Sequence, residues 1–167
     1  MLRRFLTISL VCLSAGSGWA DCGPGNTLVL SCLARGGDKA LDVCIGAGSR
    51  TISYSYGPPG GPAELSLSQP VAGVEHHPWP GIGRNIWETT VFHNAGYTYE
   101  VFISVDRMAE DDPVMGGVQL FRDGAEIARV ECDAGTVNIG LWAVSEAKEA
   151  LGYCWNQDLE TWGICAR

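Results

Sequence analysis

The sequence predicts an all-β fold, an antiparallel sandwich or partly closed barrel of about eight strands with one short C-terminal helix, held by disulfides. Three observations support this. Short runs alternate between apolar and polar residues, which is the period of a half-buried strand. The 22 glycines and 8 prolines are spread between those runs and mark turns. Six cysteines follow the N-terminal segment, and residues 21–167 have the length of one domain.

Residues 1–20 have the pattern of a secretory signal peptide. Arg3 and Arg4 precede an apolar run from Phe5 to Leu13, and small residues follow up to Ala20. The apolar run is too short to cross a bilayer, so an uncleaved anchor is the less favoured alternative. We therefore expect cleavage after Ala20 and a periplasmic or secreted domain.

The predicted mature domain is strongly acidic. Without Arg3 and Arg4, nine Lys and Arg residues stand against 19 Asp and Glu residues, a net charge of −10. Such a charge repels nucleic acid and anionic lipid, so neither nucleic acid nor a membrane is expected as a partner. It favours encounter with a cationic protein. A role of the charge in solubility alone is the alternative.

The cysteines predict disulfides. An even number in an exported chain points to bridges, and the wide spacing without a CxxC pair argues against a zinc site. The six are Cys22, Cys32, Cys44, Cys132, Cys154 and Cys165. We expect Cys32–Cys44 across the first hairpin and Cys154–Cys165 in the tail. Alternation places Cys32 and Cys44 on opposite faces, so the first pair requires a bulge, and otherwise the pairing differs.

Eight segments have strand character and are separated by turn residues. They are residues 27–34, 39–45, 50–56, 64–68, 84–93, 97–105, 118–122 and 125–132. Hairpin turns are predicted at 35–38, at Asn94-Ala95-Gly96 and at Asp123-Gly124. The glycine- and proline-rich or acidic segments 57–62, 69–83 and 107–117 are predicted to be loops. The second of these is long, and long loops are often functional.

The only helical pattern covers residues 145–151, with Ser145 as the N-cap and Gly152 after the end. This helix is too short to be stable without packing. The tail from about residue 142 to 167 is dense in Cys and Trp, so we expect a disulfide and aromatic burial to hold it.

No catalytic or metal-binding pattern is visible. There is no G-x-S-x-G elbow, so neither an enzyme nor a cofactor is predicted, although a glycan hydrolase needs only two carboxylates and stays an alternative. His76, His77 and His93 could bind a metal, but neighbours in an extended chain point to opposite sides, which favours solvated loop residues. The run Glu110-Asp111-Asp112 lacks the alternate spacing of a calcium loop.

The segment from Pro78 to Asn85 is the candidate binding site. Two prolines restrict a tryptophan, and Trp and Arg are frequent binding hot spots. A stiff loop also loses little entropy on docking. The predicted partner-binding residues are Trp79, Gly81, Gly83, Arg84 and Asn85. The alternative is that Trp79 folds back as a lid on the end of the barrel.

Several segments resemble a known family. They are Leu30-Ser31-Cys32, Val43-Cys44, Ile52-Ser53-Tyr54-Ser55-Tyr56-Gly57, Glu64-Leu65-Ser66-Leu67, Gly81-Ile82-Gly83-Arg84 and Tyr97-Thr98-Tyr99-Glu100-Val101. Over residues 27–132 the chain is similar to small periplasmic lysozyme inhibitors of bacteria. The resemblance implies an exported, disulfide-bearing β-domain that protects the cell wall from lysozyme.

The resemblance also points to the binding loop. Those inhibitors offer a Ser-Gly…Tyr loop to the lysozyme cleft, and this sequence has Gly81-Ile82-Gly83-Arg84-Asn85 near that place, without the serine or the tyrosine. Arg84 is suited to pair with the carboxylates of a cationic lysozyme. An envelope structural or interaction domain with another partner is the alternative function.

Overall fold

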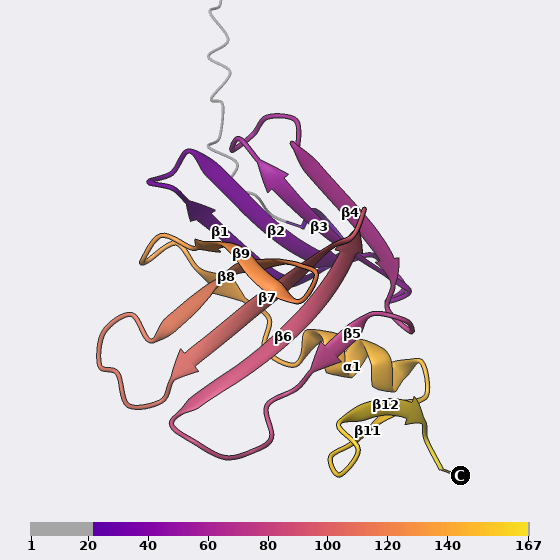
Figure 1. The fold of residues 1–167 in the computed structure, drawn as a ribbon. Helices are drawn as coiled ribbons and strands as arrows, with labels where there is room; N and C mark the ends of the chain where they lie inside the picture. The colour runs from indigo at the N-terminus through magenta and orange to yellow at the C-terminus, as the bar shows by residue number, and fades with distance from the viewer. Residues whose placement is uncertain (1–21, 167) are drawn as a thin grey trace, which may run out of the picture.

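The computed structural model describes residues 22–166, and the predicted signal peptide, residues 1–20, lies outside them. Two five-stranded antiparallel sheets pack face to face as a β-sandwich, as predicted (Figure 1). A short helix and a two-stranded hairpin lie at one end, next to β5 (Glu75–His77) (Figure 1). The alternative of a partly closed barrel is not realised, because residues 22–166 form two five-stranded sheets and one two-stranded sheet, none of which closes on itself.

The first sheet has the strand order β10-β1-β2-β3-β4. Its strands are β1 (Thr27–Ala34), β2 (Lys39–Ile45), β3 (Thr51–Gly57), β4 (Leu65–Pro70) and β10 (Asn138–Ile139). Alternation sets which side faces the core: Leu41, Val43 and Ile45 are buried, whereas the residues between them are less so.

The second sheet has the order β5-β6-β7-β8-β9. Its strands are β5 (Glu75–His77), β6 (Asn85–Asn94), β7 (Tyr97–Asp106), β8 (Val114–Arg122) and β9 (Ala125–Glu131). The predicted turns are confirmed at Ala95-Gly96, with φ of 49° and 82°, and at Asp123-Gly124, with φ of 51° and 78°. Two positive φ values in a two-residue turn match the twist of the flanking strands.

The core lies between the two sheets and is closed at one end by the helix. Phe92 from β6 and Tyr54 from β3 meet at its centre, with ring centroids 5.7 Å apart. Val144 and Ala147 of α1 (Ala143–Ala150) belong to the same cluster. The helix therefore gains its stability from packing on the sandwich, as its short length requires.

The helix begins earlier than predicted, and Ser145 is not its N-cap. Trp142 holds that position with φ of 69°, and no side chain caps the helix. Ser145 lies within the first turn and is buried, where its hydroxyl contacts a histidine instead of the helix backbone. Gly152, with φ of 85°, follows the end of the helix as expected.

All eight predicted strands are present, and four were missed. These four are β5, β10, β11 (Tyr153–Asn156) and β12 (Thr161–Ile164). The predicted loops were too long: residues 69–83 contain the end of β4 and all of β5, and residues 114–117 begin β8. The missed strands have two to four residues, too few for alternation to be recognised.

The disulfides are Cys22–Cys44, Cys32–Cys132 and Cys154–Cys165. The prediction of Cys154–Cys165 is confirmed, and that of Cys32–Cys44 is wrong. Cys32 lies opposite Leu41 and Cys44 opposite Leu28, so the two are far apart along the hairpin and on opposite faces. Cys32 instead bonds Cys132, which directly follows β9, so this disulfide joins the two sheets. An isolated antiparallel β-bridge between Ala34 and Cys132 brings the two segments together.

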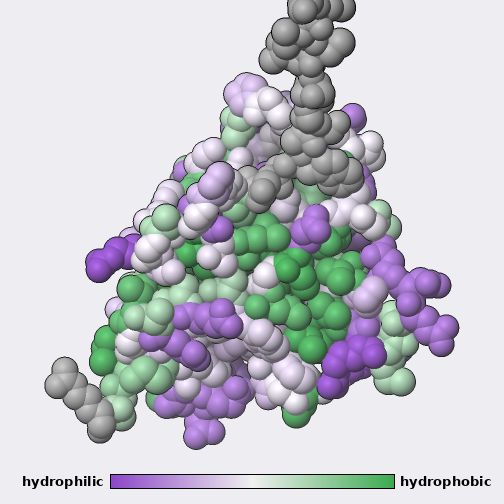
Figure 2. All heavy atoms as spheres, turned by 180° about the vertical axis from the view of Figure 1, so that it is seen from behind, coloured by the Kyte–Doolittle hydropathy of each residue, from purple (hydrophilic) through white to green (hydrophobic). Residues whose placement is uncertain are grey.

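Seen from behind, the molecule shows a continuous area of hydrophobic residues bordered by hydrophilic ones (Figure 2). Apolar atoms make up much of any folded protein's surface, so this area does not by itself mark a binding site. In the part of the chain that the structure describes, no helix has the length and apolar character to cross a membrane.

Candidate binding site

Four of the five predicted binding residues lie in one loop between β5 and β6, and the fifth, Asn85, is the first residue of β6. Pro78 and Pro80 flank Trp79, and Gly81 and Gly83 turn the chain with φ of 87° and 97°. The indole N–H of Trp79 donates to the carbonyl of Ile82 at 2.8 Å, which closes the loop on itself. We call residues 78–84 the tryptophan loop. Its shape is set by local chemistry: two fixed proline φ angles, two glycine turns and one internal hydrogen bond.

Arg107, just past the end of β7, clamps this loop from the side. Its guanidinium lies 5.1 Å from the centroid of the Trp79 ring and donates to the carbonyl oxygens of Gly83 and Arg84. The Arg107 backbone N–H also donates to Arg84 at 3.3 Å. The loop is thus ordered by contacts within the chain before any partner binds.

Arg84 and Asp106 form a two-pronged ion pair at the base of the loop. Arg84 Nε donates to Asp106 Oδ1 at 2.7 Å, and Nη2 lies 2.6 Å from Oδ2. The hydrogen bond from Arg84 is the main cause that lowers the pKa of Asp106, and the Met108 backbone N–H contributes next. The same hydrogen bond raises the pKa of Arg84. Arg84 is therefore engaged by a carboxylate of its own chain.

The tip of the tryptophan loop presents an apolar side chain. Ile82 is 75% exposed, and Met108, in the adjoining loop after β7, is 74% exposed. Both loops lie at the same end of the second sheet (Figure 1). Two more exposed apolar side chains, Trp87 of β6 and Met115 of β8, are on the outer face of that sheet. Both lie opposite Ser104 of β7, one on each side of it. The surface on and near the loop thus includes four exposed apolar side chains.

The five predicted residues have different environments. Gly81, Gly83, Arg84 and Asn85 are exposed, and Asn85 begins β6 opposite Asp106. Trp79 is half-buried between Arg107 and Trp142, outside the hydrophobic core. Whether these residues bind a partner stays a prediction.

Sequence reasoning missed Asp106, Arg107 and Met108. A signal for the first two was available, because the two-residue turn at Ala95-Gly96 fixes the register of β6 and β7. Counting back from that turn places Asp106 opposite Asn85. The clamp by Arg107 depends on a side-chain direction, which strand register alone does not determine.

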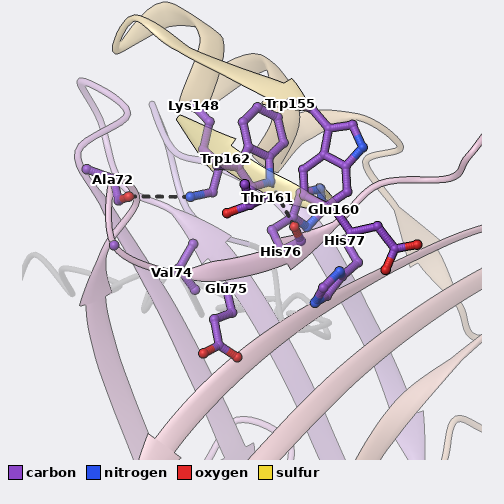
Figure 3. A pocket seen from close by; sticks show the side chains of 11 residues that line it. Ala72, Val74, Glu75, His76, His77, Lys148, Trp155, Glu160, Thr161 and Trp162 are labelled. Atoms are coloured by element: carbon purple, nitrogen blue, oxygen red, sulfur yellow. Dashed lines mark hydrogen bonds between the residues drawn. The ribbon is translucent and has the colours of Figure 1, made fainter. Parts of the chain in front are cut away.

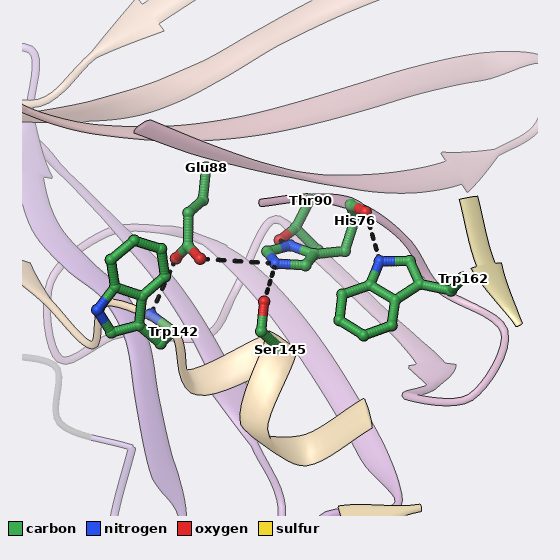
Figure 4. Close-up of polar contacts among 6 residues, drawn as sticks. All are labelled: His76, Glu88, Thr90, Trp142, Ser145 and Trp162. Carbon is green, nitrogen blue, oxygen red and sulfur yellow. Dashed lines mark hydrogen bonds and ion pairs between the residues drawn. The ribbon is translucent and has the colours of Figure 1, made fainter. Parts of the chain in front are cut away.

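Behind the loop lies a buried polar network centred on His76 (Figure 4). The prediction of a solvated histidine is wrong here, because His76 is only 2% exposed. Its Nδ1 lies 3.1 Å from Thr90 Oγ1, and its Nε2 lies 3.1 Å from Ser145 Oγ and 3.7 Å from Glu88 Oε1. His76 is on β5, and the residues that surround its ring belong to β6 and α1. His77 and His93 are exposed.

This network joins the helix to the second sheet. Glu88 is 3% exposed, and its Oε2 accepts the Trp142 backbone N–H at 3.1 Å. Ser145 and Glu88 both approach the same nitrogen of His76, whereas in a serine-histidine-acid triad the hydroxyl and the acid bond opposite nitrogens. No group of three or more His, Cys, Asp and Glu side chains within residues 22–166 could hold a metal ion.

The C-terminal hairpin covers the other side of β5 and lines a pocket of about 190 Å³ (Figure 3). The Trp162 indole N–H donates to the carbonyl of His76 at 2.8 Å. Lys148 of α1 is only 1% exposed, and its ammonium group lies 5.4 Å from the centroid of Trp162 and 3.4 Å from the carbonyl oxygen of Ala72. The tail is therefore held by aromatic packing, as predicted.

Burial lowers the pKa of Lys148 from 10.5 to about 8. Between these two pH values the unfolded chain holds a proton that the folded chain has released. Stability is therefore expected to rise from about pH 8 to about pH 10.5, by at most about 3 kcal/mol, and to be unaffected by this group below pH 8. Urea unfolding at about pH 8 and about pH 10 measures the rise. Lys148→Met should abolish it, and an unchanged rise in the variant would contradict the assignment.

Comparison of the chain with protein-family models, curated protein sequences and solved structures finds no match. The class of protein is therefore defined by the fold alone, a disulfide-stapled β-sandwich with a helix and hairpin at one end. The resemblance to periplasmic lysozyme inhibitors stays a prediction.

Proposed function

We propose that this chain is an exported, periplasmic or secreted binding protein that presents the tryptophan loop to a cationic protein. The observation that carries the proposal is the preorganised loop: Arg107 and the Trp79–Ile82 hydrogen bond hold it, and Ile82 projects from it. A loop that is already ordered loses little conformational entropy on docking. Three disulfides fit the oxidising compartment that export implies.

Charge supports a cationic partner. Residues 21–167 have a net charge of −10. Glu110 and Asp111 are exposed in the loop after β7 that also contains Met108. A net negative charge speeds encounter with a basic partner, and the apolar tip of the loop then supplies contact area.

A lysozyme is the most concrete partner, in keeping with the family resemblance. In this proposal Ile82 enters the partner's cleft. Arg84 has a different role from the one inferred from the sequence, because Asp106 engages its guanidinium. Arg84 secures the base of the loop, and the protein acts in defence of the bacterial envelope without catalysing a reaction.

The test is titration of oxidised residues 21–167 into cell-wall lysis assays with lysozymes of several types. We expect inhibition of one type at near-stoichiometric amounts, and we expect Ile82→Asp to weaken binding about tenfold or more. Ile164→Asp is the matched control, because Ile164 is also 75% exposed but lies on β12. The proposal fails if no lysozyme is inhibited by the folded protein, or if the two variants bind equally.

A further inference from the structure

A second pocket, of about 390 Å³, lies between the tryptophan loop, α1 and the C-terminal hairpin. Four tryptophans line it, Trp79, Trp142, Trp155 and Trp162, together with Glu146 and Glu149. We call it the tryptophan pocket. Its volume is in the range of small-molecule sites. Its lining combines aromatic rings with two carboxylates and includes no cationic side chain.

Contacts within the chain hold the rings in place. The indole N–H of Trp79 donates to Ile82, that of Trp162 to His76 and that of Trp155 to Gln157. Trp155 and Trp162 also pack on each other, with centroids 5.5 Å apart. Three of the four indole N–H groups are therefore already satisfied, so these rings can offer a ligand their π-systems but not their donors.

Trp142 has an unusual backbone conformation. Its φ of 69° is in the left-handed region, which a bulky side chain rarely adopts. Glu88 accepts its backbone N–H, and its ring lies 6.4 Å from that of Trp79. Such strain persists only where surrounding contacts impose it, and it often marks a binding or catalytic region.

The two carboxylates give the pocket a negative charge. Glu146 and Glu149 are three residues apart on α1, so they lie on the same face, and both are exposed. Glu149 is in the last turn, where the helix dipole disfavours a negative side chain. Glu146 is in the first turn, where the dipole favours a negative side chain. What the two carboxylates share is their mutual repulsion, which a bound cation would relieve.

The chain itself shows that these rings accept cations. Lys148 lies 5.4 Å from the Trp162 centroid, and Arg107 lies 5.1 Å from the Trp79 centroid. Neither cation lines the tryptophan pocket. An organic cation is attracted by the faces of tryptophan rings, most strongly where water is excluded.

We propose that the tryptophan pocket binds an organic cation, either a quaternary ammonium group or the charged end of a basic side chain. Four aromatic rings and two carboxylates suit such a cation. A hard metal ion would need several oxygen ligands, and an anion would be repelled. This inference goes beyond the proposed function, because a free small cation can occupy the pocket without any protein partner.

The test uses oxidised residues 21–167 and follows tryptophan fluorescence and indole NMR signals at constant ionic strength. The probes are choline, its neutral isostere 3,3-dimethyl-1-butanol, and Nα-acetyl-arginine amide. We expect choline or the arginine derivative to bind saturably, about tenfold more tightly than the neutral isostere. Binding of choline alone identifies a quaternary ammonium site, whereas binding of the arginine derivative identifies a site for basic side chains.

Charge variants locate the binding. Glu146→Gln with Glu149→Gln should weaken cation binding about tenfold. The matched control is Glu126→Gln with Glu131→Gln, which makes the same change in charge on β9. Ile82→Asp should leave choline binding intact, so failure of the proposed function and failure of this inference are distinguishable.

Three results would overturn the inference. The first is equal affinity for choline and its neutral isostere, which would indicate a merely apolar pocket. The second is equal weakening by the two charge-variant pairs, which would place the effect in the net charge of the protein. The third is binding of N-acetylglucosamine without binding of either cation, which would indicate a glycan site.

Discussion

Replacing Cys32 and Cys132 by alanine is expected to lower the free energy of unfolding by about 4 to 5 kcal/mol. This disulfide closes a loop with a sequence separation of 100 residues and joins β1 to the segment after β9, so it connects the two sheets. Its removal frees a long segment of the unfolded chain. Cys32 is also 3% exposed, so its sulfur leaves a small gap in the core. Urea unfolding followed by circular dichroism measures the loss.

The matched control is the double replacement of Cys154 and Cys165. Their sequence separation is 11 residues, for which the same relation gives about 3 kcal/mol. They belong to the two-stranded hairpin outside the sandwich, so the main unfolding transition should move less. If the two double variants have the same unfolding midpoint, the Cys32–Cys132 disulfide does not stabilise the sandwich more than the hairpin disulfide does, and the prediction is wrong.

Replacing Glu88 by alanine is expected to destabilise the protein by about 3 kcal/mol. The substitution leaves the Trp142 backbone N–H without its acceptor and removes the carboxylate beside His76. The Trp142 N–H and the His76 ring have little access to water, so water cannot replace the carboxylate that they lose. Because Trp142 is the N-cap of α1 and lines the tryptophan pocket, its release should also loosen that pocket. Urea unfolding and the tryptophan emission spectrum measure the two effects.

Glu100→Ala is the control for this variant. Glu100 lies on the outer face of β7, opposite Val91 and Gln119. Its replacement should lower the free energy of unfolding by less than about 0.5 kcal/mol. A Glu88→Ala protein as stable as Glu100→Ala would show that the network does not hold the helix on the sheet.

The strands and their turns could be predicted from the sequence because their causes are local. The predicted strands 27–34 and 39–45 have the same bounds as β1 and β2. Alternation marks which side of a strand is buried, and pairs such as Asp123-Gly124 adopt the φ angles that a tight turn needs. The strands of two to four residues are too short for such a signal.

The candidate binding site could be predicted in part. Proline, glycine and tryptophan mark the tryptophan loop within one segment, so a stiff loop was expected there. The clamp by Arg107 and the pairing of Arg84 with Asp106 join residues more than twenty positions apart. His76 was expected in solvent, because the residues that enclose it belong to β6 and α1.

The sequence by itself determined the β-class, most strands, the hairpin turns, the acidic charge and the position of the stiff loop. Each follows from composition or from neighbouring residues. Only the tertiary structure decided that Cys32 bonds Cys132, that His76 is buried, and that four tryptophans meet beside two glutamates. These outcomes depend on how two sheets, a helix and a hairpin pack together. Packing sets distances between residues far apart in the chain, and a local pattern carries no record of those distances.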